Sequence, residues 1–158
     1  MNFYDLITYD AETGLFIWSV SRRGCSAGKT AGHINSEGYR VIKLGRKPVL
    51  AHRLAWFLSF GVWPTKGIDH RNGIRDDNRL SNLREADHCI NMQNKRAAMS
   101  NNKSSGLLGV TWNKQHGRWQ SKIMANKKAH HVGLFDSPEK AHEAYLKKKR
   151  QLHAGCTI

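Results

Sequence analysis

The sequence predicts an α+β protein that consists of two small domains. Its 158 residues leave room for one ordinary domain or two small ones. Residues 97–105 have the small, polar composition of a linker. Short strands and helices are expected before this linker, and three strands followed by one helix are expected after it. The predicted domains are therefore 1–96 and 106–158.

Positive charge is the strongest bulk property of the chain. There are 26 Lys and Arg against 12 Asp and Glu, a net charge of +14 and a pI near 10.1. Residues 1–94 hold 13 basic and 9 acidic residues, whereas 95–158 hold 13 and 3. A basic protein of this size usually binds a polyanion, although a merely basic soluble protein is the alternative. We expect the C-terminal part to be the stronger electrostatic anchor.

The three cysteines favour a reducing, intracellular setting. Cys25, Cys89 and Cys156 lie far apart and form no C-x-x-C pair. Neither a structural zinc site nor a disulfide framework is therefore expected. The N-terminus has no signal-peptide pattern, and the longest apolar stretch, near 54–62, is too short to span a bilayer. These features predict a cytoplasmic protein.

Alternation and turn residues predict the N-terminal elements. Residues 38–44 alternate with period two, and a turn at 45–47 leads into a short partner strand. Apolar residues at helical spacing predict a helix from His52 to Gly61. The expected strands are 15–20, 38–44 and 48–51.

A polar, glycine-punctuated stretch follows from Asp69 to Arg79. Asn72-Gly73 is a strong turn dipeptide, so we expect a compact hairpin or loop pair around it. Asp87 is a good helix N-cap, and it predicts a helix at about 88–96.

The C-terminal domain is expected to be three antiparallel strands with one helix across them. Ser137 is a favoured N-cap, Pro138 suits the first helical position, and Glu139 places an acid in the first turn. Gly155 is expected to end this helix. The predicted strands are about 108–113, 118–125 and 129–135.

An adjacent carboxylate and imidazole at Asp69-His70 suggest hydrolysis of a phosphodiester. That reaction requires a deprotonated water, and it requires charge on the phosphate and on the leaving oxygen to be offset. The pKa of His lies near neutral pH, which suits the first task. A hard cation such as Mg²⁺ suits the others and prefers oxygen ligands, which Asp69 and Asn91 could supply. Spacing alone makes this only a suggestion.

Five short motifs run through residues 50–94. They are Leu50-Ala51-His52-Arg53-Leu54-Ala55, Ile68-Asp69-His70-Arg71-Asn72-Gly73, Asp77-Asn78-Arg79, Asn82-Leu83-Arg84 and Asn91-Met92-Gln93-Asn94. Together they resemble the HNH endonucleases, most of all the phage and intron homing branch, in which Asn replaces the last His. The resemblance covers roughly 38–96 and implies a ββα-metal site that closes on one divalent metal ion. The cysteine-based zinc knuckles of other branches have no counterpart here.

The resemblance implies a role for each matching residue. His70 would be the general base that activates water, and Asp69 and Asn91 would hold the metal, Mg²⁺ or Mn²⁺. Asn82 would be a clamp whose amide orients the loop carrying His70. The alternatives are a structural, buried His70, a turn amide at Asn82, and a helix-surface Asn91 with another group completing the metal shell.

Other residues near these motifs are less defined. Charge alone suggests that Arg71 and Arg84 hold flanking phosphates. His52 is expected to be structural or phosphate-facing rather than catalytic. The roles of His88 and Asn94 stay undecided.

Four motifs in the C-terminal part resemble the AP2 DNA-binding domain. They are Gly106-Leu107-Leu108-Gly109-Val110-Thr111-Trp112, Gly117-Arg118-Trp119-Gln120-Ser121-Lys122-Ile123, His131-Val132-Gly133-Leu134-Phe135-Asp136 and Ala141-His142-Glu143-Ala144-Tyr145. The resemblance covers about 104–155. It implies that the three-stranded sheet lies in the major groove of DNA while the helix packs behind it.

Period-two alternation separates the two faces of this sheet. Trp119, Ser121, Ile123 and Ala125 should meet the helix. Arginines stand in the plant AP2 pattern where this chain has Thr111 and Asn113, so no plant target sequence can be carried over. Arg and Gln can read base edges, whereas Lys more often holds phosphate. The expected DNA-facing residues are Thr111, Asn113, Arg118, Gln120, Lys122 and His131.

The sequence therefore predicts a monomeric, metal-dependent endonuclease for double-stranded DNA. The N-terminal domain would cut and the C-terminal domain would position it, as in a phage-type homing or mobile enzyme inside a bacterial host. A non-catalytic DNA-binding regulator is the main alternative, and it has no need for Asp69, His70 and Asn91 together. An RNase or a nonspecific, toxin-like nuclease is a third, and a dedicated DNA-binding domain argues against it.

Overall fold

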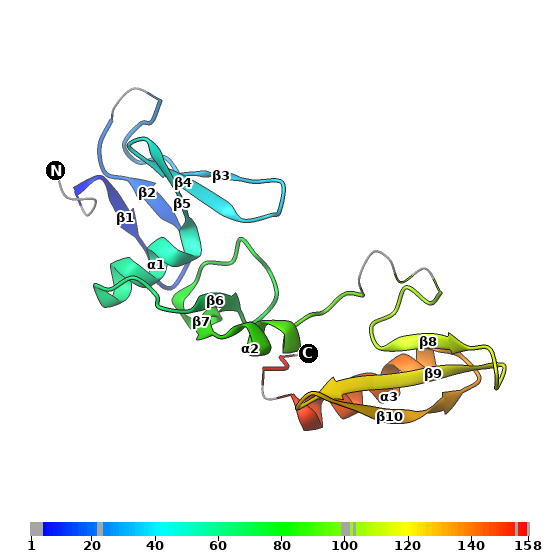
Figure 1. Cartoon of the computed structure of the whole chain (residues 1–158). Coiled ribbons are helices and arrows are strands. Elements are labelled where there is room, and N and C mark those ends of the chain that lie inside the picture. Colours follow the sequence, from blue (N-terminus) through cyan, green and yellow to red (C-terminus); the bar gives the residue numbers. More distant parts are fainter. Residues whose placement is uncertain (1–4, 22–23, 99–101, 103, 154, 158) are drawn as a thin grey trace. The chain divides into compact units, whose positions relative to one another are not determined.

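The computed structural model describes residues 5–21, 24–98, 102, 104–153 and 155–157. By its contacts the chain divides into unit 1, Met1–Asp87, and unit 2, His88–Ile158. Each unit is mixed α and β, with small antiparallel sheets and few helices (Figure 1). This confirms the α+β fold class. No helix in the described part of the chain is long and apolar enough to cross a membrane.

Unit 1 begins with two small sheets and a helix. β1 pairs antiparallel with β2, and β3, β4 and β5 form a three-stranded sheet in that order. The helix α1 ends where Gly61 adopts a left-handed conformation and donates its N–H to Phe57 O, as the sequence predicts. The bounds are β1 Ile7–Tyr9, β2 Phe16–Trp18, β3 His33–Ile34, β4 Arg40–Leu44, β5 Lys47–Leu50 and α1 Ala51–Phe60.

One apolar core joins these elements. Phe16, Ile42 and Leu54 are fully buried, and each such side chain contributes about 1.5–3 kcal/mol relative to exposure. The same cluster includes Leu83, which pairs with His70 across the hairpin that follows α1. The core therefore anchors the segment that the sequence singles out for chemistry.

That segment is an open hairpin rather than a compact one. β6, Gly67–His70, pairs antiparallel with β7, Leu83–Ala86, and a short 3-10 turn, η2 Leu80–Asn82, precedes β7. The Asn72-Gly73 turn only opens the long loop between the strands. Of the two alternatives expected around Asn72-Gly73, the compact hairpin is thus wrong, because β6 pairs with a strand that lies beyond Arg79.

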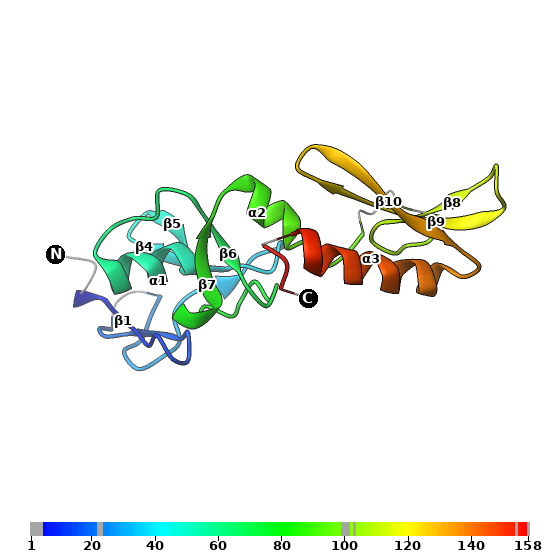
Figure 2. The same cartoon turned by 90° about the horizontal axis from the view of Figure 1, so that it is seen from below.

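Unit 2 starts with α2, His88–Gln93, which is shorter than the predicted helix at 88–96. The strands β8 Val110–Asn113, β9 Arg118–Ala125 and β10 Lys128–Phe135 form one antiparallel sheet with β9 in the centre. The helix α3, Pro138–Leu152, lies across the sheet (Figure 2). Its cap is as predicted, since Ser137 Oγ accepts the N–H of Lys140 at 3.3 Å.

The alternation predicted for β9 is confirmed. Ser121, Ile123 and Ala125 are buried, whereas Lys122 and Met124 are exposed. The buried residues face α3, which contacts all three strands.

The end of α3 and the residues after it pack against the segment that contains α2. Lys149 is fully buried, and its Nζ donates a hydrogen bond to the carbonyl of Lys95. The N–H of Gly155 donates to Gln93 Oε1 at 2.9 Å. α2 is therefore built into unit 2, although the sequence groups it with the motifs of unit 1.

Gly109 offers a test of the packing in unit 2. Its φ is +76°, and a Cβ there would lie only 2.0 Å from the Tyr145 ring. Gly117 also has a positive φ, +59°, but a Cβ there would meet nothing within 4 Å. Both Ala variants carry backbone strain. Gly109→Ala should lower the free energy of unfolding by roughly 1–3 kcal/mol more than Gly117→Ala does, because its Cβ also overpacks against Tyr145. Urea unfolding of the two variants measures this difference, and equal losses would contradict the packing of Tyr145 on Gly109.

Candidate active site

The loop between β6 and β7 is closed by the side-chain amide of Asn82. Its Oδ1 accepts the backbone N–H of Asn72 at 2.9 Å, and its Nδ2 donates to the carbonyl of Asp77 at 2.8 Å. The Asn82 carbonyl accepts the N–H of Arg71 at 2.8 Å, and the residue is only 7% exposed. One buried residue therefore holds the loop that begins directly after His70.

Asp69 forms an ion pair with Arg84 on the neighbouring strand. The register of the hairpin places the two residues opposite each other. Nε and Nη2 of Arg84 donate to Asp69 Oδ2 at 2.9 and 2.7 Å, and the side chains are 17% and 11% exposed. The carboxylate is thus oriented, and its charge is balanced.

The imidazole of His70 lies among other rings. Its centroid is 5.1 Å from that of His52, with an interplanar angle of 85°, and 6.0 Å from that of Tyr39. The Tyr39 and His52 rings are 5.3 Å apart, so the three rings form one cluster. The guanidinium of Arg75 lies over Tyr39 at 5.0 Å. α1 supplies His52, and the turn before β4 supplies Tyr39.

Burial keeps these two imidazoles neutral. Desolvation lowers the pKa of His70 below its ordinary 6.5, while hydrogen bonding by the Asn78 amide and the charge of Asp69 act in the opposite direction. Desolvation, followed by the effects of His70 and Arg53, lowers the pKa of His52 to about 4. A neutral imidazole can accept a proton, so at pH 7 His70 is in the form that a general base requires.

The sequence did not indicate that Tyr39 and Asn78 contribute to this site. Asn78 is 1% exposed, and the N-terminal hairpin holds its backbone, because Tyr9 Oη donates to the Asn78 carbonyl at 2.8 Å. A Cβ on Gly14 would lie 2.7 Å from the Asn78 backbone, which shows how closely this hairpin approaches. The one available signal is that Asn78 falls within a short motif, whereas nothing near Tyr39 marks it.

The remaining predicted residues lie in different places. Arg71 is exposed in the loop after β6. His88 is exposed at the start of α2, and Asn91 is half-buried on the same helix in unit 2. Asn94 is buried and accepts a hydrogen bond from Thr157 Oγ1. Unit 1 therefore brings together Asp69, His70, Asn82 and Arg84.

A cation at Asp69 would need oxygen ligands beyond carboxylates. In the described part of the chain, no three or more His, Cys, Asp and Glu side chains are grouped so that they could hold a metal ion. Mg²⁺ is usually bound by one or two carboxylates and completed by water and phosphate oxygens. A carboxylate with an amide oxygen is a donor set of this kind, so the residues present fit such an ion.

The six residues predicted to face DNA lie on one side of the sheet in unit 2. Residues directly opposite each other in an antiparallel pair share a face, and the six form three such pairs. Gln120 also contacts His131, with 3.3 Å between Nε2 and Nδ1, and Arg118 forms an exposed ion pair with Asp136. The cross-strand pairs are Thr111 with Gln120, Asn113 with Arg118, and Lys122 with His131.

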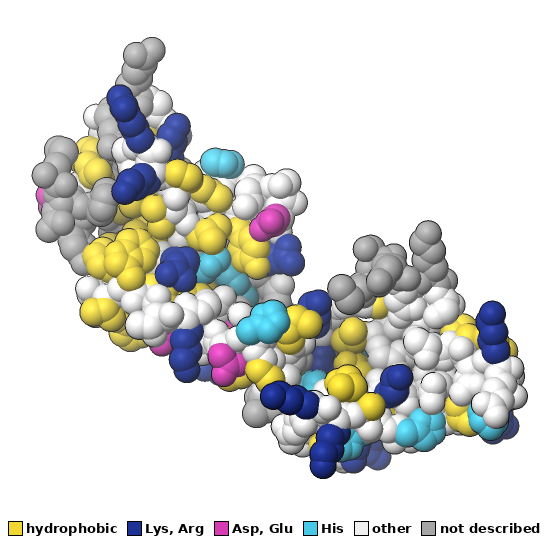
Figure 3. All heavy atoms as spheres, viewed as in Figure 1, with side chains coloured by type: hydrophobic (Ala, Val, Ile, Leu, Met, Phe, Trp, Pro, Cys, Tyr) yellow, Lys and Arg dark blue, Asp and Glu magenta, His cyan; other side chains and the backbone are white. Residues whose placement is uncertain are grey.

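This unit also carries most of the excess charge. Unit 2 has 13 Lys and Arg against 3 Asp and Glu, whereas unit 1 has 13 against 9. Figure 3 shows Lys and Arg side chains at several places on the surface of unit 2. A face of polar and basic side chains on such a unit is suited to a polyanion.

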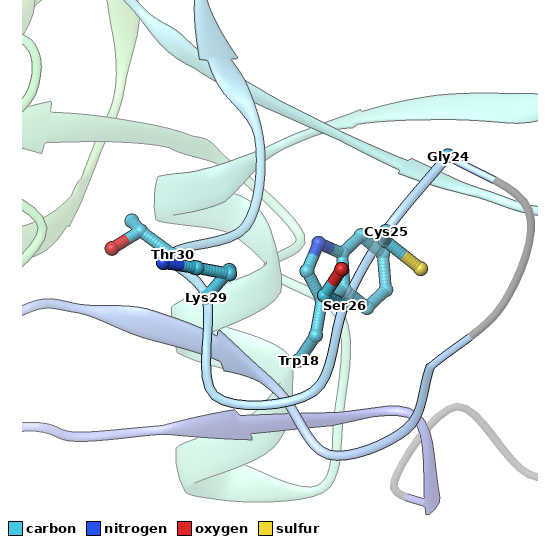
Figure 4. A pocket seen from close by; sticks show the side chains of 6 residues that line it. All are labelled: Trp18, Gly24, Cys25, Ser26, Lys29 and Thr30. Atoms are coloured by element: carbon cyan, nitrogen blue, oxygen red, sulfur yellow. The ribbon is translucent and has the colours of Figure 1, made fainter.

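Unit 1 also contains a hollow of about 380 Å³, which is lined by residues other than those of the candidate site. Figure 4 shows the side chains that line it. None of the residues predicted for chemistry is among them, so it does not enlarge the candidate site. The lining residues are Trp18, Gly24, Cys25, Ser26, Lys29 and Thr30.

Comparison with known proteins bears on both units. The profile of the HNH endonuclease family matches residues 49–93, a stretch that includes α1 and the β6–β7 hairpin. Protein 3.8 of Escherichia phage T7 is 34% identical over 104 residues, which cover 65% of this chain and 83% of that protein. The chain belongs to the HNH endonuclease family. This confirms the resemblance carried by the motifs from Leu50 to Asn94.

Two plant proteins are also similar to this HNH protein. The AP2-like ethylene-responsive transcription factors PLT2 and ANT of Arabidopsis thaliana are 30% and 29% identical over 101 and 124 residues, which cover 63% and 74% of this chain. The chain spans only about a fifth of their length, 18% and 22%. A solved structure of the HNH homing endonuclease I-HmuI is 24% identical and covers 94% of this chain and 88% of its own, with a TM-score of 0.42.

His52 provides a pH test of the site. Its pKa falls from 6.5 in the unfolded chain to about 4 in the folded one. Between these values the unfolded state binds more protons than the folded state. The contribution of a neutral His52 to the free energy of unfolding is therefore fully present above pH 6.5 and declines as the pH falls towards 4. The shift corresponds to a loss of up to roughly 3 kcal/mol. Urea midpoints at pH 7.5, 5.5 and 4.5 should fall less steeply for His52→Gln than for the wild type. Equal slopes would show that His52 is not held neutral.

Proposed function

We propose that this HNH protein is a metal-dependent endonuclease that hydrolyses phosphodiester bonds in double-stranded DNA. One observation carries the proposal: a single hairpin carries the ion-paired Asp69 and, directly after it, the buried His70, while Asn82 holds the loop between its strands. A segment built only for stability would have little reason to bury a neutral imidazole beside an ion-paired carboxylate.

In this proposal His70 is the general base. Its imidazole is neutral at pH 7 because burial lowers its pKa, so it can take a proton from the attacking water. Asn82 has a positioning role, since its amide holds the loop that follows His70. Arg71, exposed in that loop, would hold a phosphate beside the scissile bond.

Asp69 and Asn91 would hold one divalent metal ion, Mg²⁺ or Mn²⁺. When bound, such an ion offsets charge on the phosphate and on the leaving oxygen. Both side chains offer the oxygen donors that a hard cation prefers. Asp69 lies in unit 1 and Asn91 in unit 2, so the assignment of Asn91 rests on its place in the family motif.

Unit 2 would bind and position the DNA in the manner of an AP2 domain. The three cross-strand pairs on its exposed face support this role, as does the similarity of the chain to proteins named AP2-like transcription factors. Gln120 and Arg118 could read base edges, and Lys122 would hold a phosphate. The enzyme would act as a monomer inside the cell, in a phage-infected bacterial host.

A DNA-binding regulator is the competing function, because the plant relatives are named transcription factors. It would use unit 2 alone. It assigns no task to the hairpin that carries Asp69 and His70.

Cleavage of supercoiled plasmid DNA separates the two functions. With Mg²⁺ and DNA that contains the target site, the wild type should produce nicked or linear plasmid, and chelator should abolish the products. His70→Ala should reduce the rate by at least roughly 10²-fold, because it removes the base. His33→Ala, an exposed His on β3 outside the hairpin, is the matched control and should keep the rate of the wild type. Absence of Mg²⁺-dependent products from the wild type on such DNA would leave the regulator as the better account.

A further inference from the structure

In unit 2 the hairpin of β9 and β10 continues beyond the end of β8 as a two-stranded ribbon (Figure 1). β9 pairs with β8 from Arg118 to Ser121, whereas its pairing with β10 extends to Ala125. A turn at Asn126 and Lys127, both with positive φ, closes the ribbon. The major groove of B-DNA admits a two-stranded β-ribbon, so this is the kind of element that can enter it.

One face of the ribbon carries an exposed apolar pair. Met124 lies two positions after Lys122 on β9, so both side chains are on the face predicted to meet DNA. Met124 is 57% exposed, and its cross-strand partner Ala129 is exposed as well. The opposite face is covered, since Ile123 and Ala125 are buried where α3 packs on the strands. Single exposed apolar residues are common on protein surfaces, so the surroundings of the pair decide what it can bind.

The surroundings of the pair are basic. Residues 122–131 contain three lysines and no Asp or Glu, and Lys122, Lys127 and Lys128 are all exposed. An apolar protein surface, or a second copy of this chain, would have to dehydrate or approach these charges without compensation. The phosphates that border a groove of DNA would neutralise them. The charge around the pair therefore favours DNA as its partner.

The backbone of Met124 is held in place by the end of α3. His153, the residue that follows the helix, donates a hydrogen bond from Nε2 to the Met124 carbonyl at 2.8 Å. The position of the Met124 side chain along the ribbon is thus set by the fold. A contact made from a fixed backbone costs less ordering on binding than a contact made from a free loop.

We propose that Met124 is a specificity-determining residue that contacts the C5-methyl group of a thymine in the major groove. The inference rests on the proposed function, because it takes this face of the sheet as the face that meets DNA. Met has no hydrogen-bond donor and only a weak acceptor, so it is poorly suited to the polar groups of the base edges. The methyl group of thymine is the apolar feature that the bases present in the major groove. Met124 would therefore add an apolar contact to the polar contacts expected from Gln120 and Arg118.

Replacement of thymine by uracil, which lacks only the methyl group, tests this contact. The full chain selects its preferred DNA from a random library in chelator, and each thymine of the selected site is then changed to uracil in turn. At one thymine or more, the Kd of the wild type should weaken about 4-fold, the ratio for one buried methyl group. At the same position the ratio should fall to about 1 in Met124→Ala. Met124→Leu keeps an apolar side chain and should retain part of the ratio.

Val62→Ala is the matched control, because it shortens an exposed apolar side chain of unit 1, and it should keep the ratio of the wild type. Circular dichroism verifies that each variant is folded. A site with no thymine that is sensitive to uracil would overturn the inference. So would a ratio unchanged in Met124→Ala, because an equal loss on both DNAs would come from contact with the sugar–phosphate backbone. If the selection enriches no sequence, the proposed positioning of DNA by unit 2 itself fails, and the inference fails with it.

Discussion

The side-chain amide of Asn82 is the interaction on which the rest of the site depends. The loop from Arg71 to Asn82 is long and polar, and free loops of this kind seldom keep one conformation. Asn82 is buried beside the apolar core and, from the end of the loop, bonds to backbone groups at its start and in its middle. Because buried amides must be satisfied, this arrangement makes the loop conformation part of the folded state. The position of His70, directly before the loop, follows from it.

The different tasks that we propose for the two units agree with their charge and burial. Unit 1 is nearly balanced in charge, and it buries a neutral imidazole among rings and an apolar core, with Asp69 paired to Arg84 beside it. Unit 2 has a large positive excess and an exposed, polar sheet face. A domain that cuts needs dry, oriented groups, whereas a domain that holds DNA needs accessible charge. Joining two modest surfaces also raises the effective affinity.

Periodicity and motifs predicted most of the local structure. The faces of β9 follow from alternation alone, and the start of α3 follows from Ser137 and Pro138. The strand Leu83–Ala86 was not expected, because its residues have little β propensity and pair with β6 only across a long loop. The cluster of Tyr39, His52 and His70 could not be read from the sequence either, because tertiary packing of distant segments creates it.

The central proposal is that Asp69, on the β6–β7 hairpin of unit 1, is a ligand of a divalent ion beside the general base. Paramagnetic broadening by substoichiometric Mn²⁺ in NMR spectra of the full chain tests it most directly. The account predicts that signals of His70 and of the β6–β7 hairpin broaden first, and that Asp69→Asn removes the effect. Broadening that begins elsewhere, or that persists in Asp69→Asn, would contradict it.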